Sequence, residues 1–182
     1  MSRLRIILTP QPGASVGMTE LEAWGRAALP LAPADAQPVN LAWGARPRAS
    51  FTSRYDSVSE INDMVVAFSR YSRNRWTSYG SPNASDWIEL DLPAAHGVAR
   101  VELYLWGDGG GTRAPAGYTV QAWQHGAWVD VAIRSQVPAT PMTSSVNTVS
   151  LTPVTTSRVR VVFRNARPAA TGVTEVMLYG DD

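Results

Sequence analysis

A glycine-rich loop between an acidic and a basic residue is the first place in this sequence where residue types and spacing suggest chemistry. In WGDGGGTRAPAGY, residues 106–118, three consecutive glycines separate Asp108 from Thr112 and Arg113. Glycine gives the backbone conformational freedom and allows close approach by another group. A phosphate-binding loop must lead into a helix N-terminus, and a Walker loop also needs Gly-Lys-Ser/Thr. This loop joins two strand-like segments and has no such lysine, so it does not predict a phosphate site.

Asp108 and Arg113 leave two interpretations open. A carboxylate and a guanidinium can hydrogen-bond neighbouring hydroxyls of a sugar, while the glycines let the ligand approach the backbone. Alternatively, Asp108 and Arg113 pair with each other and only brace the loop. The sequence does not decide between a sugar site and an internal ion pair.

The chain is rich in tryptophan, with seven among 182 residues, and aromatic faces can contact the C–H patches of sugars. Trp76 and Trp87 lie in strand-like segments, where core packing is expected. Trp123 and Trp128 flank a turn and are expected to pack across it. The aromatics near strand ends or in loops are the better candidates for ligand contact: Tyr55, Tyr71, Tyr79 and Trp106.

Nothing in the sequence requires catalysis. Glycoside hydrolysis needs two carboxylates on opposite sides of a cleft, whereas Asp86, Glu89 and Asp91 crowd one strand-like segment and suit solvated or salt-bridged positions. The two histidines lie in turn-like contexts, and there is no serine nucleophile elbow. A small hydrolase or lyase remains the weaker alternative to a binding domain.

Oxygen ligands for a hard metal ion are present but far apart in the chain. Calcium takes several oxygens from loop carboxylates and backbone carbonyls. Asn62 and Asp63 in one loop and Glu175 beside the last strand can supply such oxygens if the fold brings them together. Spacing alone does not show that it does.

Composition narrows the classes of partner. The net charge is +1, all sixteen basic residues are arginine, and RYSRNR (residues 70–75) accompanies no nucleic-acid-binding motif. There is no cysteine, and no run of about 18 apolar residues that a membrane-spanning helix would need. We therefore expect neither a nucleic-acid nor a membrane partner.

The elements that must position these residues are predicted to be β-strands. Apolar and polar residues alternate in residues 98–106, 118–123, 127–133 and 157–163, with Gly, Pro and Ser between the segments. This pattern predicts an all-β sandwich. Residues 57–68 follow helical spacing instead, and Ser57 and Glu60 form a possible capping box, so one short helix or an ordered loop is expected there.

The N-terminus repeats the C-terminus. Residues 2–25 align without a gap to residues 157–180, so that Glu20 matches Glu175 and Gly25 matches Gly180, which indicates a repeated unit. We interpret residues 1–25 as the closing hairpin of a preceding similar β-domain, or as strands added to the domain that follows. Residues 26–40 are rich in Ala and Pro and predict a semi-rigid linker. The chain is expected to be a piece of a larger protein.

Residues 41–180 resemble the discoidin-like domain of the coagulation factor V/VIII type C class. The resemblance rests on NLAWGARPRASFTSRYDSVSEINDM, on RW followed by DWIELDLP and VARVELYLW, and on the closing segment VTTSRVRVVF…TGVTEVMLYG. Within that class, FTSRYDS and DGGGTRAPAGYTVQAW are most similar to family 32 carbohydrate-binding modules appended to bacterial enzymes that degrade plant polysaccharides.

The resemblance implies a jelly-roll β-sandwich of about eight antiparallel strands in residues 41–182, like galactose-binding domains, with residues 1–25 as an extra N-terminal β-hairpin. It also implies a non-catalytic module that holds a secreted bacterial glycan-degrading enzyme on plant-type polysaccharide, with the catalytic domain in the same chain as its partner. A structural spacer without a ligand is the alternative. Lipid or protein binding would need apolar loop tips, and GDGGGTRAP and SYGSPNAS are too polar for that.

Loops at one end of the sandwich carry the implied site. The expected sugar contacts are Tyr55, Asp56, Trp106, Asp108 and Arg113, with the aromatics stacking and the charged groups binding hydroxyls. The family commonly holds a structural calcium ion near an Asp-Gly turn and the Glu before the last strand, which correspond here to Asp63 and Glu175. Met64 stands where the glycine is usual, so the geometry of this turn is an open question.

Overall fold

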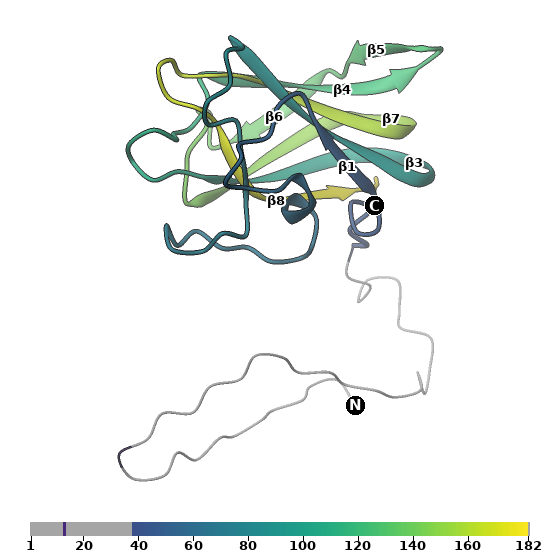
Figure 1. The fold of residues 1–182 in the computed structure, drawn as a ribbon. Helices are drawn as coiled ribbons and strands as arrows, with labels where there is room; N and C mark the ends of the chain where they lie inside the picture. The colour runs from purple at the N-terminus through teal and green to yellow at the C-terminus, as the bar shows by residue number, and fades with distance from the viewer. Residues whose placement is uncertain (1–12, 14–37, 182) are drawn as a thin grey trace. The chain divides into compact units, whose positions relative to one another are not determined.

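The computed structural model describes Gly13 and residues 38–181, and in this part the chain folds almost entirely into antiparallel β-structure (Figure 1). The strands are β1 (Arg46–Ala49), β2 (Trp76–Thr77), β3 (Ser85–Trp106), β4 (Gly117–Gln124), β5 (Ala127–Asp130), β6 (Ile133–Val137), β7 (Ser145–Arg164) and β8 (Gly172–Tyr179). The prediction of about eight antiparallel strands is confirmed. The predicted N-terminal hairpin and most of the predicted linker lie outside the described residues.

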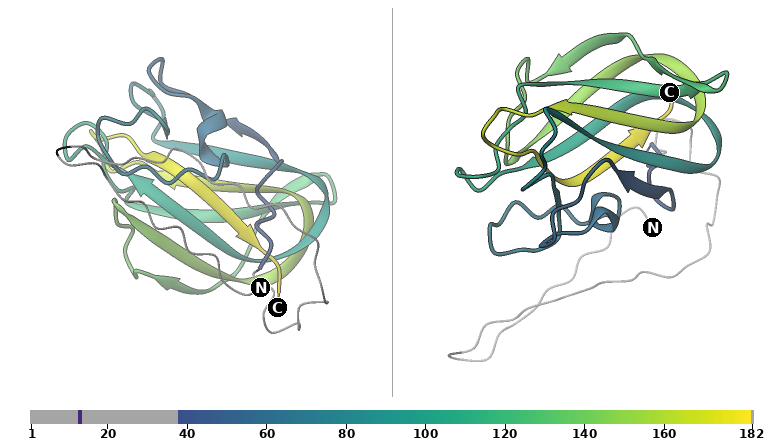
Figure 2. Two further views of the ribbon diagram at one scale, coloured as in Figure 1. Left: turned by 90° about the horizontal axis from the view of Figure 1, so that it is seen from below. Right: turned by 45° about the horizontal axis from the view of Figure 1, so that its top comes forward.

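Strands β3 and β7 are long enough to contribute to both layers of a sandwich (Figures 1 and 2). Residues 85–91 of β3 pair with residues 158–164 of β7, and β1, β4 and β5 extend this layer. Residues 100–105 of β3 pair with residues 145–150 of β7, and β2, β6 and β8 extend the other layer. Register shifts in β3 between Asp91 and His96, and between Val98 and Arg100, mark where the strand passes from one layer to the other.

The core lies between the layers and follows the alternation in the sequence. Leu103 and Leu105 of one layer and Val161 and Phe163 of the other belong to one buried apolar cluster. Strand residues point alternately to opposite faces of a sheet, so Arg158 and Arg160 lie on the outer face. The sequence prediction of an inward apolar face and an outward arginine face on residues 157–163 is confirmed.

The segment 57–68, expected to be one short helix or an ordered loop, contains a single turn of 3-10 helix, η2 (Val58–Ile61). The Ser57 hydroxyl accepts a hydrogen bond from the Ser59 N–H, so the expected capping box with Glu60 does not form. After η2 the chain turns through Met64 at a φ of 70°, a left-handed conformation that a helix cannot contain. Residues 62–75 are therefore an ordered loop. No helix in the described residues is long and apolar enough to cross a membrane.

Candidate functional site

Four segments meet beside the strand ends and form what we call the loop cluster: residues 50–57, 75–84, 107–116 and 165–171. Backbone hydrogen bonds join them. The N–H of Ser78 donates to the carbonyl of Thr171 at 2.9 Å, and the N–H of Arg113 donates to the carbonyl of Ala170 at the same distance. A bridge between Thr112 and Ala170 adds to this contact. The cluster is therefore a fixed scaffold rather than four separate loops.

Asp108 organises the glycine-rich loop from within. Its Oδ1 accepts hydrogen bonds from the N–H groups of Gly110 (2.8 Å) and Thr112 (2.9 Å). Burial alone would raise the pKa of Asp108, but these amides hold its pKa below the usual value. Arg113 donates from Nε to the carbonyl of Gly110 at 3.1 Å. Asp108 and Arg113 thus brace the backbone separately, and no ion pair joins them in the described structure.

The glycines serve two different purposes in this loop. Gly109 has a φ of 75°, which favours glycine over residues with a side chain. Gly111 lies so close to Tyr79 that a Cβ atom there would come within 2.9 Å of the Tyr79 ring. The close approach expected from the sequence is therefore made by an aromatic side chain of a neighbouring loop.

A hollow of about 160 Å³ gathers four of the five sugar contacts expected from the sequence: Tyr55, Asp56, Trp106 and Asp108. The other residues that line it are Ser53, Arg75, Thr77, Tyr79 and Thr112. Arg113 is exposed but does not line this hollow. The fold thus brings residues from three separate segments to one surface.

The floor of this hollow is closed by Asp56, Arg75 and Trp106. Arg75 Nε lies 3.0 Å from Asp56 Oδ1, and the Thr77 hydroxyl donates to Asp56 Oδ2 at 2.6 Å. The Arg75 guanidinium carbon lies 3.9 Å from the centre of the Trp106 ring, a close cation–π contact. Trp106 is only 4% exposed, so its ring offers no open face for stacking. The nearly buried carboxylate of Asp56 instead positions Arg75.

The open groups of the hollow are two tyrosine rings and one carboxylate oxygen. Tyr55 is 55% exposed and Tyr79 is 51% exposed. Asp108 Oδ1 takes both loop amides, which leaves Oδ2 without a donor among the described residues. Tyr71, also a candidate from the sequence, is exposed but lies outside this hollow. Arg75 was not among the residues expected at this site. Its position directly before β2 was the only indication of its role in the sequence.

Asp63 and Glu175, the two metal ligands implied by the resemblance, lie close together. Burial and the nearby Asp63 carboxylate raise the pKa of Glu175 to about 8. Glu175 is fully buried, and neither of its carboxylate oxygens has a hydrogen-bond partner of good geometry among the described residues. The nearby amides of Met64 and Val65 lower its pKa but do not offset the effect of burial and of Asp63. A buried carboxylate without donors is costly unless a cation neutralises it.

The surroundings of this pair fit a calcium ion. Oδ1 of Asn74 is also buried without a donor, and its Nδ2 donates to Asp63 Oδ2 at 2.6 Å. No group of three or more acidic, histidine or cysteine side chains in the described residues is arranged to hold a metal ion, so backbone carbonyls and water would have to complete the shell around these two carboxylates. Met64 adopts a left-handed φ of 70°, a conformation that glycine adopts more readily than residues with a side chain.

Comparison with protein families decides the class of the domain. The model of the NedA-like, galactose-binding domain of the F5/F8 type C group matches residues 59–161. The chain belongs to this family. The match spans most of η2, the strands from β2 to β6 and most of β7, together with two of the four segments of the loop cluster, 75–84 and 107–116. No curated protein matches the sequence.

Solved structures show the same fold at low sequence identity. A chain of the Streptococcus pneumoniae β-galactosidase BgaA matches with a TM-score of 0.74 and 19% identity, over 80% of this chain and all of that one. Chitosan-binding module 1 of a Paenibacillus chitosanase/glucanase matches at 0.58 and 22%, over 78% and 99%. The family 32 carbohydrate-binding module of Clostridium perfringens NanJ, solved with galactose, matches at 0.58 and 15%, over 74% and 93%. This galactose-binding-like domain is therefore similar in fold to carbohydrate-binding modules of glycoside hydrolases.

Proposed function

We propose that this domain is a non-catalytic carbohydrate-binding module and that the hollow between Tyr55, Tyr79 and Asp108 binds the saccharide. The observation that carries the proposal is the pair of half-exposed tyrosine rings beside a carboxylate oxygen without a donor. A tyrosine ring packs against the C–H face of a sugar. Asp108 Oδ2 accepts a hydrogen bond from a hydroxyl, and Arg75 donates one at the floor.

The roles within the site differ from those expected from the sequence. Tyr55 and Tyr79 make the stacking contacts, while Asp56 acts on the ligand only through Arg75. Trp106 supports Arg75 from below. Arg113 keeps the glycine-rich loop in shape and lies at its edge. The hollow is small and open, so the affinity for one sugar unit is expected to be modest.

Galactose-type sugars are the first class of ligand to test. The family description names galactose, and the structure of the NanJ module contains it. We further propose that the domain holds a secreted bacterial glycan-degrading enzyme on plant-type polysaccharide, with the catalytic domain in the same chain. The likeness to modules of a β-galactosidase and a chitosanase supports this setting. A structural calcium ion bound by Asp63 and Glu175 stabilises the loops near the site.

Affinity electrophoresis and calorimetry test the proposal directly. Galactose-containing plant polysaccharides are expected to retard the protein, and Tyr79→Ala and Asp108→Ala are expected to weaken binding about tenfold or more, because they remove a stacking face and an acceptor. Arg134→Ala, an exposed position on β6 away from the hollow, serves as the matched control. No retardation by any polysaccharide favours the spacer alternative, and release of reducing sugar contradicts the non-catalytic assignment.

A further inference from the structure

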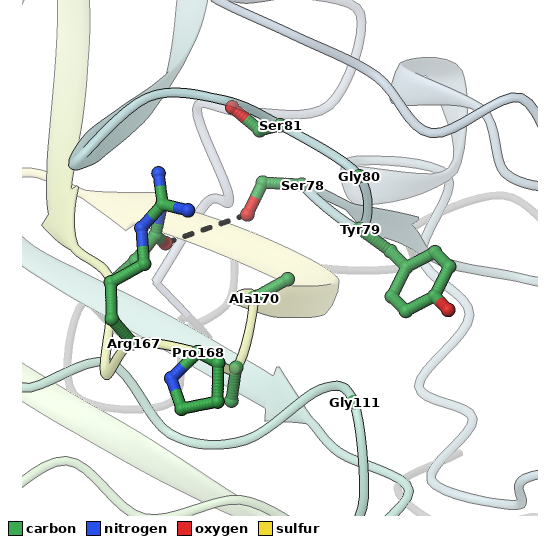
Figure 3. A pocket seen from close by; sticks show the side chains of 10 residues that line it. Ser78, Tyr79, Gly80, Ser81, Gly111, Arg167, Pro168 and Ala170 are labelled. Carbon is green, nitrogen blue, oxygen red and sulfur yellow. Dashed lines mark hydrogen bonds between the residues drawn. The ribbon is translucent and has the colours of Figure 1, made fainter.

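A second hollow lies directly beside the proposed sugar site, on the other side of Tyr79. It has a volume of about 340 Å³, and segments 78–81 and 165–170 of the loop cluster form most of its lining, together with Gly111. Figure 3 shows Arg167 and Tyr79 flanking it from opposite sides, with Ala170 between them. Tyr79 lines both hollows, so a ligand would have to pass this ring to occupy both.

The two hollows differ in charge. The first is lined by Asp56, Asp108 and Arg75. The second has Arg167 as the only charged residue among the residues that line it. A group that binds in the second hollow therefore meets positive charge without a competing carboxylate at the surface.

The one acidic group beneath the second hollow is already satisfied. Asp86 is fully buried and accepts hydrogen bonds from four side chains: Ser50, Ser81, Asn83 and Asn165. Burial alone would raise its pKa, but these donors hold the pKa of Asp86 below the usual value. Asp86 therefore fixes the shape of the hollow floor and forms no ion pair with Arg167 in the described structure.

Arg167 is exposed yet held in place. One of its terminal nitrogens, Nη2, donates to the backbone carbonyl of Asn83. A guanidinium has five N–H groups, and the remaining ones have no acceptor among the described residues. An exposed guanidinium with unused donors at the edge of a hollow is suited to a planar or tetrahedral anion.

We propose that the loop cluster binds an acidic saccharide of at least two units, with one sugar ring against Tyr79 and Tyr55 and the anionic group of the next unit on Arg167. The anion is a carboxylate or a sulfate ester, since both match the guanidinium. A third hollow, lined in part by Arg54, Tyr55 and Tyr79, adds a second cation beside the tyrosine rings, where Arg54 bonds to the Tyr55 hydroxyl. This proposal rests on the proposed function and names the ligand class of the same site.

Calorimetry with matched oligosaccharides tests the proposal. The probes are α-1,4-linked digalacturonate and its neutral counterpart, α-1,4-linked digalactose, with sulfated and unsulfated digalactose as a second pair. The acidic member of at least one pair is expected to bind about fivefold more tightly in low salt, as one exposed ion pair allows, and high salt should remove the difference. The pair that shows it identifies the anion.

Substitution of Arg167 locates the effect. Arg167→Ala is expected to abolish the preference for the acidic probe while leaving affinity for neutral digalactose unchanged, and Arg134→Ala is expected to change neither. Equal affinity for acidic and neutral probes, or an acidic preference that survives Arg167→Ala, overturns the proposal while the sugar site stands. Absence of binding by every probe contradicts the proposed function itself.

Discussion

Two of the regions in which arginine and aromatic side chains meet leave very different surfaces. On the outer face of one layer, Arg158 and Arg160 stack between Trp87, Trp123 and Trp128, with guanidinium carbons 4.0–5.0 Å from the ring centres. We call these five residues and Glu89 the tryptophan–arginine face. In the loop cluster, Arg75 covers Trp106 in the same way and Arg54 lies over one face of Tyr55 at 4.7 Å, but the Tyr55 and Tyr79 side chains stay half exposed.

The buried carboxylates of the two regions show the same contrast. Glu89 is 1% exposed and bonds to Arg158 at 2.6 Å and Arg160 at 3.0 Å. Glu175, near the loop cluster, is equally buried, and its oxygens have no donor. The tryptophan–arginine face completes its own interactions. The loop cluster and its surroundings instead leave half-exposed tyrosine side chains, carboxylate oxygens without donors and N–H groups of Arg167 without acceptors among the described residues. Such incomplete regions are where a ligand or an ion is expected.

The largest expected effect is on the stability of the tryptophan–arginine face. Glu89→Gln removes the charge that holds two arginines, and we expect the free energy of unfolding to fall by about 2–3 kcal/mol, because breaking a buried ion pair leaves uncompensated charge. Urea denaturation measures this loss. Asp91→Asn is the control on the same strand face, since Asp91 lies 3.7 Å from Arg48 in a more exposed pair that should contribute less than about 1 kcal/mol. Equal losses of stability in the two variants would contradict the difference between the buried ion pairs of Glu89 and the more exposed pair of Asp91.

The next largest expected effect is that of calcium on thermal stability, and the size of this effect should depend on pH. The pKa of Glu175, about 8 in the metal-free protein, exceeds its usual value near 4.5, so folding favours the protonated form. Stability without calcium is therefore highest below the usual pKa and falls as pH rises through about 8. Calcium competes with this proton, so we expect it to raise Tm by about 5 °C or more at pH 8.5 and by less at pH 6.

Differential scanning calorimetry with calcium and with chelator measures this effect. Glu175→Gln keeps the shape of the side chain but removes the titrating group, so it should flatten the pH dependence and abolish the calcium effect. A Tm that is identical with calcium and chelator at both pH values rules out the proposed calcium site.

In the loop cluster, Asp108→Asn should affect binding more than folding. The amide retains one oxygen for the N–H groups of Gly110 and Thr112 but loses charge and an acceptor for the ligand. We expect a loss of affinity of about five- to tenfold, with less than about 1 kcal/mol of lost stability. Calorimetric titration and urea denaturation of the same sample separate the two quantities. Unchanged affinity shows that Asp108 only braces the loop.

The smallest expected effect comes from the glycines beneath Tyr79. Gly111→Ala places a methyl group 2.9 Å from the Tyr79 ring, so the ring must shift, and we expect saccharide affinity to fall about threefold. Gly110→Ala is the matched control, because its nearest neighbour would be Asp108 Oδ1 at an ordinary 3.6 Å. If Gly110→Ala lost as much saccharide affinity as Gly111→Ala, the loss would not come from a shift of the Tyr79 ring.

Much of the fold could be predicted from the sequence, because a strand with one buried face has an apolar residue at every second position. The alternation of apolar and polar residues in 98–106 and 157–163 predicted that each segment forms a strand and which of its faces is buried. Both predictions are confirmed. In residues 57–68 the apolar spacing imitates a longer helix, and of the two expected outcomes, a short helix or an ordered loop, the structure has one 3-10 turn followed by a loop. A turn with a left-handed Met64 rules out the longer helix, and methionine carries no local signal for such a conformation.

The site was less predictable than the strands because it depends on contacts between distant segments. The sequence identified Tyr55, Asp108 and the loops around them, and the fold brings these to one hollow. It gave no sign that Arg75 would cover Trp106, since that contact joins two strand ends. The prediction that Asp63 and Glu175 lie close together came from the resemblance to the family rather than from their spacing in the sequence.

The most direct test of the contrast between the two regions is a titration of the ¹⁵N-labelled protein with galactose, followed by amide chemical shifts. We predict that the largest shifts fall in the loop cluster, at Tyr55, Arg75, Tyr79 and the glycines beside Asp108. The tryptophan–arginine face should remain unchanged. Shifts that centre on Trp123 and Trp128, or the absence of any shift, would contradict the assignment of the loop cluster as the saccharide site.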